Sequence, residues 1–342
     1  MPSMPAVCLM SNEAEDIRVI EAPVPEPGPG QVLLKPLKAG ICGSDISAYL
    51  AKPHFNHVIR PRILGHEFCA EIADLGPGVT GFEVGQRVCP IAVQSCGECE
   101  ACRRGNTQQC RDRRIIGFHF DGGMAGYCVC RTEWLMPIRY GLSDTEAALI
   151  EPLSVSSRCV VRNCDIKPGQ SVIVSGPGII GMFCALVARA LGGQVTVTGA
   201  EADAAVRLKT AADLGFDTLT VSDANPLHEQ LEEPVDCLIE ASGDPNAVAL
   251  AGKSVKWGGE ISLVATYSRS TTFNPTDYVR AEQQIRTTMA STWGDFERAQ
   301  KHLRDRIVPV ETLVREYPLD EAVEAFADSR DKATAKAVLR IA

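Results

Sequence analysis

The chain has 342 residues, of which 45% are hydrophobic and 23% are charged, and its formal net charge is −9. A chain of more than about 300 residues is expected to form two domains, because a single hydrophobic core stops growing near that size. The negative charge argues against nucleic acid or an anionic membrane as the partner, since both attract a basic face. Neither a signal peptide nor a run of about 18 apolar residues is present, so we expect a cytoplasmic protein without a transmembrane helix.

The region 6–140 is predicted to be rich in β-strands and loops. Short runs of apolar and β-branched residues alternate there with turns that contain glycine and proline. The runs include 32–34, 87–93 and 126–129, and the turns include 25–30 and 76–81. A helix is expected at 142–150, because Ser143 and Glu146 form the pattern of a capping box.

From residue 170 onward, apolar strand-like runs alternate with helical patterns. The expected strands are 171–175, 194–198, 235–241 and 260–265, and the expected helices are 179–191, 204–214 and 246–257. This alternation predicts a parallel, doubly wound α/β sheet. Amphipathic segments at 296–304 and 319–327 and a β-like run at 337–341 follow, and the sequence leaves open whether they rejoin the first domain.

A glycine-rich turn connects the first of these strands to the first helix. Its residues are Gly176, Pro177, Gly178, Ile179, Ile180 and Gly181. In such a turn the first glycine permits a sharp bend, the second lets the backbone approach a pyrophosphate, and the third lets the helix pack closely on the strand. Alone, the pattern could be a simple glycine turn. Between a predicted strand and a predicted helix, it indicates a dinucleotide site at the helix N-terminus.

The end of the second strand bears on the choice between NAD and NADP. An acidic residue there accepts hydrogen bonds from the adenosine ribose and repels the extra phosphate of NADP. The usual position holds Gly199, whereas Glu201 and Asp203 follow it and Arg207 comes shortly after. Either acid can serve the ribose, or both can simply favour the dipole of the next helix. The balance slightly favours NAD, with NADP as the alternative.

Four of the 14 cysteines follow one another closely, at Cys96, Cys99, Cys102 and Cys110. Four thiolates at this spacing can close a tetrahedron around one Zn²⁺. A ferredoxin-type run would place its last cysteine after three intervening residues and follow it with proline, and this segment does neither. We therefore predict a structural zinc site without an open coordination position.

Three further segments carry residues of the metal-ligand type. They contain Cys42, the pair His66 and Glu67, and Glu151. Each has an ordinary structural explanation when taken singly, such as a packed thiol or a hydrogen-bonded histidine. Together with a nucleotide-binding fold, they suggest one catalytic metal site. Oxidation of an alcohol needs a Lewis acid on its oxygen and a nicotinamide that accepts the hydride.

Taken in order, these motifs resemble the zinc-dependent medium-chain dehydrogenases, and in particular the sorbitol or polyol dehydrogenase branch. The resemblance covers essentially the whole chain. It rests on 40–45, Gly65-His66-Glu67, the four-cysteine lobe, 121–125, 151–155, Gly176 to Gly181, and 240–243. It implies a GroES-like β-rich catalytic domain at 1–153 and 292–342 with a zinc lobe at 89–112, and a Rossmann domain at 154–291.

The resemblance also implies roles for individual residues. Cys42 and His66 correspond to zinc ligands, and Glu67 to a third acidic or exchangeable ligand. Glu151 corresponds to the acidic residue of the polyol branch that binds zinc directly or through water. Ser44 would hydrogen-bond the substrate oxygen and relay its proton, while Asp45 would orient the site. In the cofactor domain, Ala241 and Ser242 are expected at the dinucleotide site.

The chain departs from the family pattern at positions that affect the substrate. Ser47 stands where many relatives have a histidine for proton exit, so His54 or His57 in the following loop could take that role. Ala290-Ser291 stands where sorbitol dehydrogenases have an Arg-Tyr pair that holds sugar hydroxyls. The predicted substrate is therefore a secondary alcohol of a polyol, a cyclitol or an amino alcohol.

Three alternatives stay open at this point. The chain could be a threonine-type or a simple alcohol dehydrogenase. It could also be a non-catalytic nucleotide-binding protein of the same fold, although retention of Cys42, Ser44 and His66 argues against that. The resemblance further implies a homodimer or a homotetramer.

Overall fold

The computed structural model describes residues 2–342, and the chain divides into two compact units. Unit 1 contains the residues up to Glu151 together with Ala290–Asp305 and Val314–Ala342. Unit 2 contains Pro152–Met289 and Arg306–Leu313. Within 2–342, no helix combines the length and the apolar character needed to cross a bilayer.

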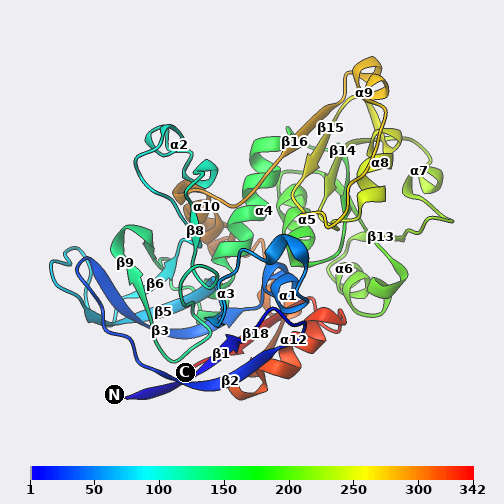
Figure 1. Cartoon of the computed structure of the whole chain (residues 1–342). Helices are drawn as coiled ribbons and strands as arrows, with labels where there is room; N and C mark the ends of the chain where they lie inside the picture. The colour runs from blue at the N-terminus through cyan, green and yellow to red at the C-terminus, as the bar shows by residue number, and fades with distance from the viewer. Residues whose placement is uncertain (1) are drawn as a thin grey trace. The chain divides into compact units, whose positions relative to one another are not determined.

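Unit 1 is built on a seven-stranded sheet in the order β10-β6-β5-β3-β18-β17, with β9 also paired to β3 (Figure 1). The strands are β3 (Gln31–Gly40), β5 (Glu67–Leu75), β6 (Arg87–Pro90), β9 (Cys128–Arg131), β10 (Leu135–Pro137), β17 (Val314–Pro318) and β18 (Lys336–Arg340). The smaller sheets contain β1 (Ser3–Leu9), β2 (Ile17–Pro23) and β4 (Arg62–Ile63), and β7 (Val93–Gln94) with β8 (Arg114–Ile115). The last strand of the chain, β18, therefore pairs with β3 near the beginning of the chain.

The helices of unit 1 are short. They are α1 (Gly43–Tyr49), α2 (Glu100–Arg103), α3 (Asp144–Ala148), α10 (Trp293–Arg304) and α12 (Ala322–Arg330), with 3-10 turns η1 (Pro53–Phe55), η2 (Thr107–Gln109), η3 (Thr132–Trp134) and η6 (Leu319–Glu321). One apolar core joins the strands to α1 and α12 through buried side chains such as Leu34, Phe68 and Phe326. Ala70 on β5 is fully buried in this core.

Unit 2 is built on a six-stranded sheet whose neighbouring strands are all parallel, in the order β13-β12-β11-β14-β15-β16. The strands are β11 (Ser171–Ser175), β12 (Gln194–Gly199), β13 (Asp217–Thr220), β14 (Val235–Glu240), β15 (Val255–Leu263) and β16 (Gln284–Thr287). The chain order reverses direction at β11, which is the arrangement of a doubly wound dinucleotide-binding sheet. The predicted fold of this region is confirmed.

The helices associated with this sheet are α4 (Ile150–Asn163), which starts at the unit boundary, α5 (Ile179–Ala190), α6 (Lys209–Asp213), α7 (Leu227–Gln230), α8 (Pro245–Ser254), α9 (Pro275–Ala281) and α11 (Val310–Leu313), with η4 (Glu201–Asp203) and the π-helical turn η5 (Ala204–Leu208). The core strand β11 is apolar and buried at Val172–Val174, and α5 buries Met182–Ala188. The alternation of the sequence arises because both faces of a parallel sheet are covered.

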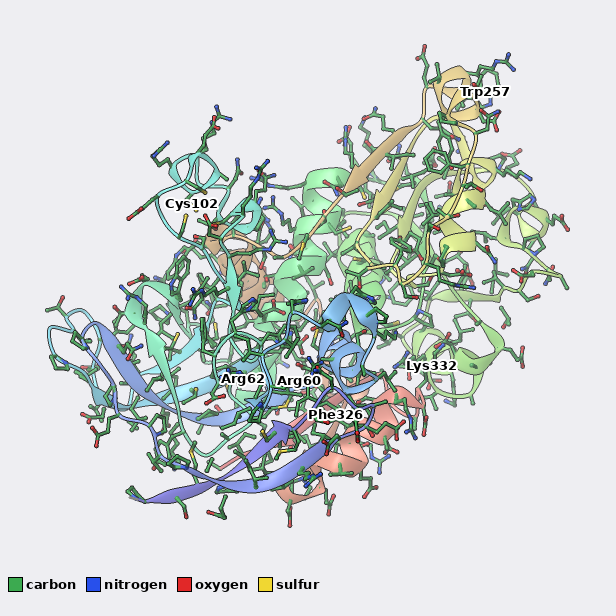
Figure 2. All side chains as sticks on the ribbon, viewed as in Figure 1. Arg60, Arg62, Cys102, Trp257, Phe326 and Lys332 are labelled. Atoms are coloured by element: carbon green, nitrogen blue, oxygen red, sulfur yellow. The ribbon has the colours of Figure 1, made fainter. Side chains whose placement is uncertain are left out.

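Several predicted boundaries were wrong. The helix expected at 246–257 ends at Ser254, and Trp257 belongs to β15 with 81% of its surface exposed (Figure 2). The apolar run at 87–93 is broken into β6 and β7 after Pro90, which cannot donate a hydrogen bond in a sheet. The strands β13 and β16 were missed because they lie at the edges of the sheet and carry half-buried or exposed side chains.

Candidate active site and metal centres

The turn from β3 into α1 positions the first predicted ligand. Cys42 is the N-cap of α1, and its Sγ accepts a hydrogen bond from the Ser44 N–H at 3.5 Å. The Cys42 N–H in turn donates to Asp45 Oδ2 at 3.0 Å, which completes a capping box. The Cys42 thiol is thus held by the same local bonds that start the helix.

The second predicted ligand lies at the start of β5, beside this turn. His66 is 5% exposed, and its Nε2 lies 3.2 Å from Ser44 Oγ. Its Nδ1 lies 3.5 Å from Asp45 Oδ1. Asp45 is fully buried, and burial raises the pKa of its carboxyl group. Asp45 therefore contacts both the backbone of one predicted ligand and the ring of the other.

Cys42, His66 and Glu67 form a group that suits a metal ion, because their ligand atoms all lie within 4.8 Å of one another. Glu151 lies outside this group of three but close enough to raise the pKa of the Cys42 thiol, which burial and Glu67 raise more strongly. Burial and the Glu67 charge also raise the pKa of Glu151 to about 7. This concentration of acidic groups is costly without a cation and favourable with one, so the residues fit zinc.

One cation faces this acidic cluster, and the sequence analysis missed it. Lys336 on β18 is 2% exposed and forms an ion pair with Glu67. Its Nζ also donates to the Ile41 carbonyl at 2.8 Å. A lysine directly before the apolar run Ala337–Leu339 was the available signal, because a buried lysine needs a partner. Pairing strand β18 with strand β3 brings Lys336 to the site.

The four predicted structural cysteines also come together. Their sulfur atoms lie within 4.8 Å of one another, with Cys99–Cys102 at 3.4 Å, Cys110–Cys96 at 3.5 Å and Cys96–Cys102 at 3.9 Å. A tetrahedron with Zn–S bonds of about 2.3 Å has edges of about 3.8 Å. Burial alone would raise the pKa of Cys102, but hydrogen bonds within the lobe, including the one from Cys99, lower it to about 7, which favours the ligating thiolate. Cys102 is labelled on this lobe in Figure 2.

Close packing accounts for two of the glycines in the glycine-rich turn of unit 2. Gly176 has φ of 102°, and a Cβ there would lie 2.6 Å from Ser242 Cα. A Cβ on Gly181 would lie 1.9 Å from the Gly176 carbonyl oxygen. A Cβ on Gly178, by contrast, would meet no atom of the protein within 4 Å. The fold itself thus requires the first and third glycines, and the second leaves its backbone accessible to a ligand.

The residues expected near the ribose differ in their surroundings. Asp203 is buried, accepts from the Ala200 N–H at 3.3 Å and pairs with Arg207 at 3.6 Å. Glu201 is exposed. At Gly199, a Cβ would lie 2.9 Å from Pro177 Cγ, so a side chain at this position would crowd the glycine-rich turn.

Glu240 supports the other side of that turn, and the sequence analysis assigned it no site role. It is fully buried at the end of β14, where it accepts hydrogen bonds from the Ser242 N–H at 2.8 Å, the Ser242 hydroxyl and the Tyr267 hydroxyl. These bonds fix Ala241 and Ser242 against Gly176. A buried carboxylate with several donors is a rigid support for a loop.

Comparison with known proteins agrees with this geometry. The alcohol dehydrogenase GroES-like domain matches residues 28–140, and the zinc-binding dehydrogenase domain matches residues 180–305. The chain is 34% identical to a sorbitol dehydrogenase of Halalkalibacterium halodurans over 90% of this chain and 91% of that protein. The chain belongs to the zinc-dependent medium-chain dehydrogenase family.

The sorbitol dehydrogenase similarity and one further relative support the sorbitol-dehydrogenase-like branch, and a solved structure supports the fold. An L-galactonate-5-dehydrogenase of Escherichia coli is 30% identical over 93% of each chain. A crystal structure of a zinc-binding dehydrogenase from Sinorhizobium meliloti, bound to NADP, has a TM-score of 0.88 and 26% identity, covering 99% of this chain and 100% of that one. The predicted GroES-like and Rossmann fold, the dehydrogenase activity on an alcohol, and the zinc and nicotinamide cofactors are confirmed.

Proposed function

We propose that the protein oxidises a secondary hydroxyl group of a polyol, cyclitol or amino alcohol to a ketone, with Cys42, His66 and Glu67 as zinc ligands and Glu151 as a direct or water-mediated ligand. The grouping of Cys42, His66 and Glu67 within 4.8 Å carries this assignment. When bound, zinc supplies a Lewis acid that acidifies the substrate hydroxyl, and NAD(P) accepts the hydride. The net reaction converts the alcohol and NAD(P)⁺ to the ketone, NAD(P)H and one proton.

The chain's own residues have separate tasks in this proposal. Ser44 Oγ, now 3.2 Å from His66 Nε2, accepts the proton of the substrate hydroxyl and passes it outward. Asp45 holds the His66 ring from the Nδ1 side and the Cys42 backbone from its N–H. Cys96, Cys99, Cys102 and Cys110 hold a second zinc that stabilises the lobe.

A variant series tests the site. Cys42→Ala and His66→Ala should each abolish turnover while dinucleotide affinity stays within about twofold, since ligand loss removes the Lewis acid alone. Metal analysis of the wild-type protein should give two zinc ions per chain, and each variant should give one. Full turnover by either variant would exclude the assignment.

We propose NAD as the preferred cofactor, bound at Gly176–Gly181 with Ala241 and Ser242. Glu201 is exposed, whereas Asp203 and Arg207 are engaged with each other, which leaves Glu201 as the acidic group for the ribose. Glu201→Gln should reduce the ratio of NAD to NADP efficiency by roughly tenfold, corresponding to about 1.4 kcal/mol. An unchanged ratio would contradict this role.

Measurements with a panel of substrates distinguish the proposed substrate classes from the alternative functions. Reduction of NAD and NADP, followed by absorbance, is measured with polyols, cyclitols, amino alcohols, L-threonine and simple alcohols. A threonine-type or simple alcohol dehydrogenase would favour one of the last two classes. A non-catalytic nucleotide-binding protein would bind NAD(P) and oxidise none of the alcohols.

We further propose a homodimer that joins two copies through the edge strand β16. Ile285 on this strand is 40% exposed, and the neighbouring Val279 and Met289 are 75% and 52% exposed. Ile285 is the one apolar residue of this four-residue strand, and an unpaired strand edge with an exposed apolar side chain can pair with a second copy. Ile285→Lys should lower the mass found by light scattering. A tetramer would need an additional surface.

A cellular location and a set of domain boundaries complete the proposal. We place the protein in the cytoplasm, because all 14 cysteines are free thiols and a reducing compartment keeps such thiols available for zinc. The boundaries proposed from the sequence, 1–153 with 292–342 and 154–291, would be tested by limited proteolysis.

A further inference from the structure

A cluster of aromatic and histidine rings lies beside His66, and the proposed mechanism does not use it. The Phe118 ring is buried and lies edge-on to the His66 ring, with centroids 5.1 Å apart. Phe118 also contacts Phe55 at 6.0 Å and His57 at 6.2 Å. His57 is therefore two ring contacts away from a predicted zinc ligand.

His57 pairs with a second histidine on the more exposed side of this cluster. The rings of His57 and His119 have centroids 5.9 Å apart and an interplanar angle of 33°. His57 is exposed and His119 is half-buried, although both flank the buried Phe118. Both histidines belong to unit 1, as do Ser44 and His66.

Backbone contacts fix the orientation of both rings. His57 Nδ1 lies 3.1 Å from the His54 carbonyl oxygen, to which it donates. His119 Nδ1 accepts from the Ile115 N–H at 3.0 Å. The His119 ring therefore carries its proton on Nε2 and can donate it to a carboxylate, whereas the Nε2 of His57 can donate only when the ring carries a second proton.

Two arginines lie near this pair. Burial lowers the pKa of His119, and the positive charges of His57, Arg114 and Arg62 lower it further, whereas a hydrogen bond with the Ile115 backbone raises it. Arg62, labelled in Figure 2, is also paired with Asp121 at 2.8 Å. Positive side chains near the rings favour an anion over a neutral group.

Resting on the proposed dehydrogenase function, we propose that His57 and His119 bind the carboxylate of a hydroxy acid whose alcohol carbon lies at Ser44 and His66. A short polyhydroxylated acid would carry both groups, with its carboxylate at the histidine pair and its reacting alcohol at Ser44 and His66.

The decisive experiment compares an acid with the matching neutral alcohol. Values of kcat and KM are measured for L-galactonate and galactitol, and for L-threonine, with His57→Asn, His119→Asn and the double variant. Asparagine keeps a group near the Nδ1 position for the backbone bond and removes Nε2. Glutamine variants, which place an amide nearer to the Nε2 position, serve as the conservative substitution. His228→Asn in unit 2 is the control.

We expect the wild type to prefer an acid. In the double variant, KM for that acid should rise at least tenfold, with kcat and the galactitol parameters changed less than twofold and with partial rescue by the glutamine variants. Calorimetry with a deoxy acid that cannot be oxidised should show the same loss of affinity. Equal losses for the acid and for galactitol would overturn the proposal.

Other outcomes separate the proposals from one another. Oxidation of galactitol but of no hydroxy acid would overturn the carboxylate subsite and leave the dehydrogenase proposal intact. A preference for a sugar phosphate over the acid would also overturn it, since the anion would then be a phosphate. Oxidation of no alcohol of any class would contradict the proposed function itself.

Discussion

Lys336 and Glu67 are 269 residues apart in the chain and form a buried ion pair beside the predicted zinc ligands. Both side chains are 1% exposed. Lys336 lies on β18 and Glu67 on β5, and the strand between them, β3, ends at Gly40 opposite Glu67. A buried charge that loses its partner is strongly destabilising, so this pair couples the end of the chain to the active site.

Replacing Lys336 by methionine should destabilise the protein, because the Glu67 carboxylate would stay buried without its cation. The expected loss is about 3–5 kcal/mol, measured by urea unfolding of chelator-treated protein, in which no zinc balances the Glu67 charge. Lys38→Ala is the matched control. Lys38 pairs with Glu316 at side-chain exposures of 16% and 32%, so its loss should cost less than about 1 kcal/mol. A Lys336→Met variant as stable as the control would contradict the role of the pair.

Gly40→Ala should disturb the same pair by crowding it. An added Cβ would lie 2.6 Å from Glu67 Oε2 and 2.9 Å from Lys336 Cε. Gly43→Ala, three residues later, would meet no atom within 4 Å and lies in α1, where alanine is favoured. Thermal unfolding should show a lower midpoint for the first variant and an unchanged or higher one for the second. The reverse order would refute the packing argument.

The stability of zinc-free protein should depend on Glu151. Burial and the Glu67 charge raise the pKa of its carboxyl group to about 7, from the usual 4.5 of a glutamate in water. The folded state thus holds a proton that the unfolded state has lost, so this favourable contribution is complete below pH 4.5 and is lost as the pH rises through 7. Glu151→Gln should therefore raise the unfolding midpoint of chelator-treated protein at pH 8 by about 2–4 °C for each kcal/mol gained.

The comparison between two pH values provides the control for that prediction. At pH 4 the wild-type carboxyl group is largely protonated in both the folded and the unfolded state, so the midpoints of wild type and Glu151→Gln should nearly coincide. A difference of the same size at both pH values would show that a change in packing, and not the charge of Glu151, is responsible.

Alanine substitution in the cofactor turn should weaken NAD binding at the middle glycine and should also lower the stability at an outer glycine. Gly178→Ala should fold normally, since its Cβ meets no protein atom within 4 Å, but it should bind NAD at least tenfold more weakly because the methyl group obstructs the pyrophosphate. Gly181→Ala should lower the unfolding midpoint as well, because its Cβ would overlap the Gly176 carbonyl. Calorimetric titration and thermal unfolding, measured on both variants, distinguish the two effects. Equal NAD affinity in Gly178→Ala and wild type would contradict the assignment.

Loss of the structural zinc should affect one unit only. Cys110→Ser removes a buried ligand of the lobe, so metal analysis should find one zinc ion less per chain and proteolysis should cut near 96–110. NAD affinity depends on unit 2 and should stay within twofold of wild type. Retention of two zinc ions would refute the four-cysteine site.

Motifs whose members lie close together in the sequence could be recognised without a structure. The cysteine lobe, the glycine-rich turn between β11 and α5, and the capping box at Ser143 and Glu146 each depend on neighbouring residues, so spacing alone carries their geometry. The parallel sheet was predictable for a similar reason, because burial of both faces leaves an apolar pattern in each central strand. Edge strands β13 and β16 lack that pattern.

The tertiary structure decided what depends on pairing between distant segments. The sequence marked Cys42 and His66 as candidate ligands, but only the fold sets Ser44 against His66 and Asp45 against both. Lys336 reaches Glu67 because β18 returns to β3, a register that no local pattern encodes. His57 and His119 likewise meet ring to ring although 62 positions separate them in the chain, and no local spacing predicts that contact. Local propensity acts over a few residues, whereas such contacts arise from the burial of whole elements against one another.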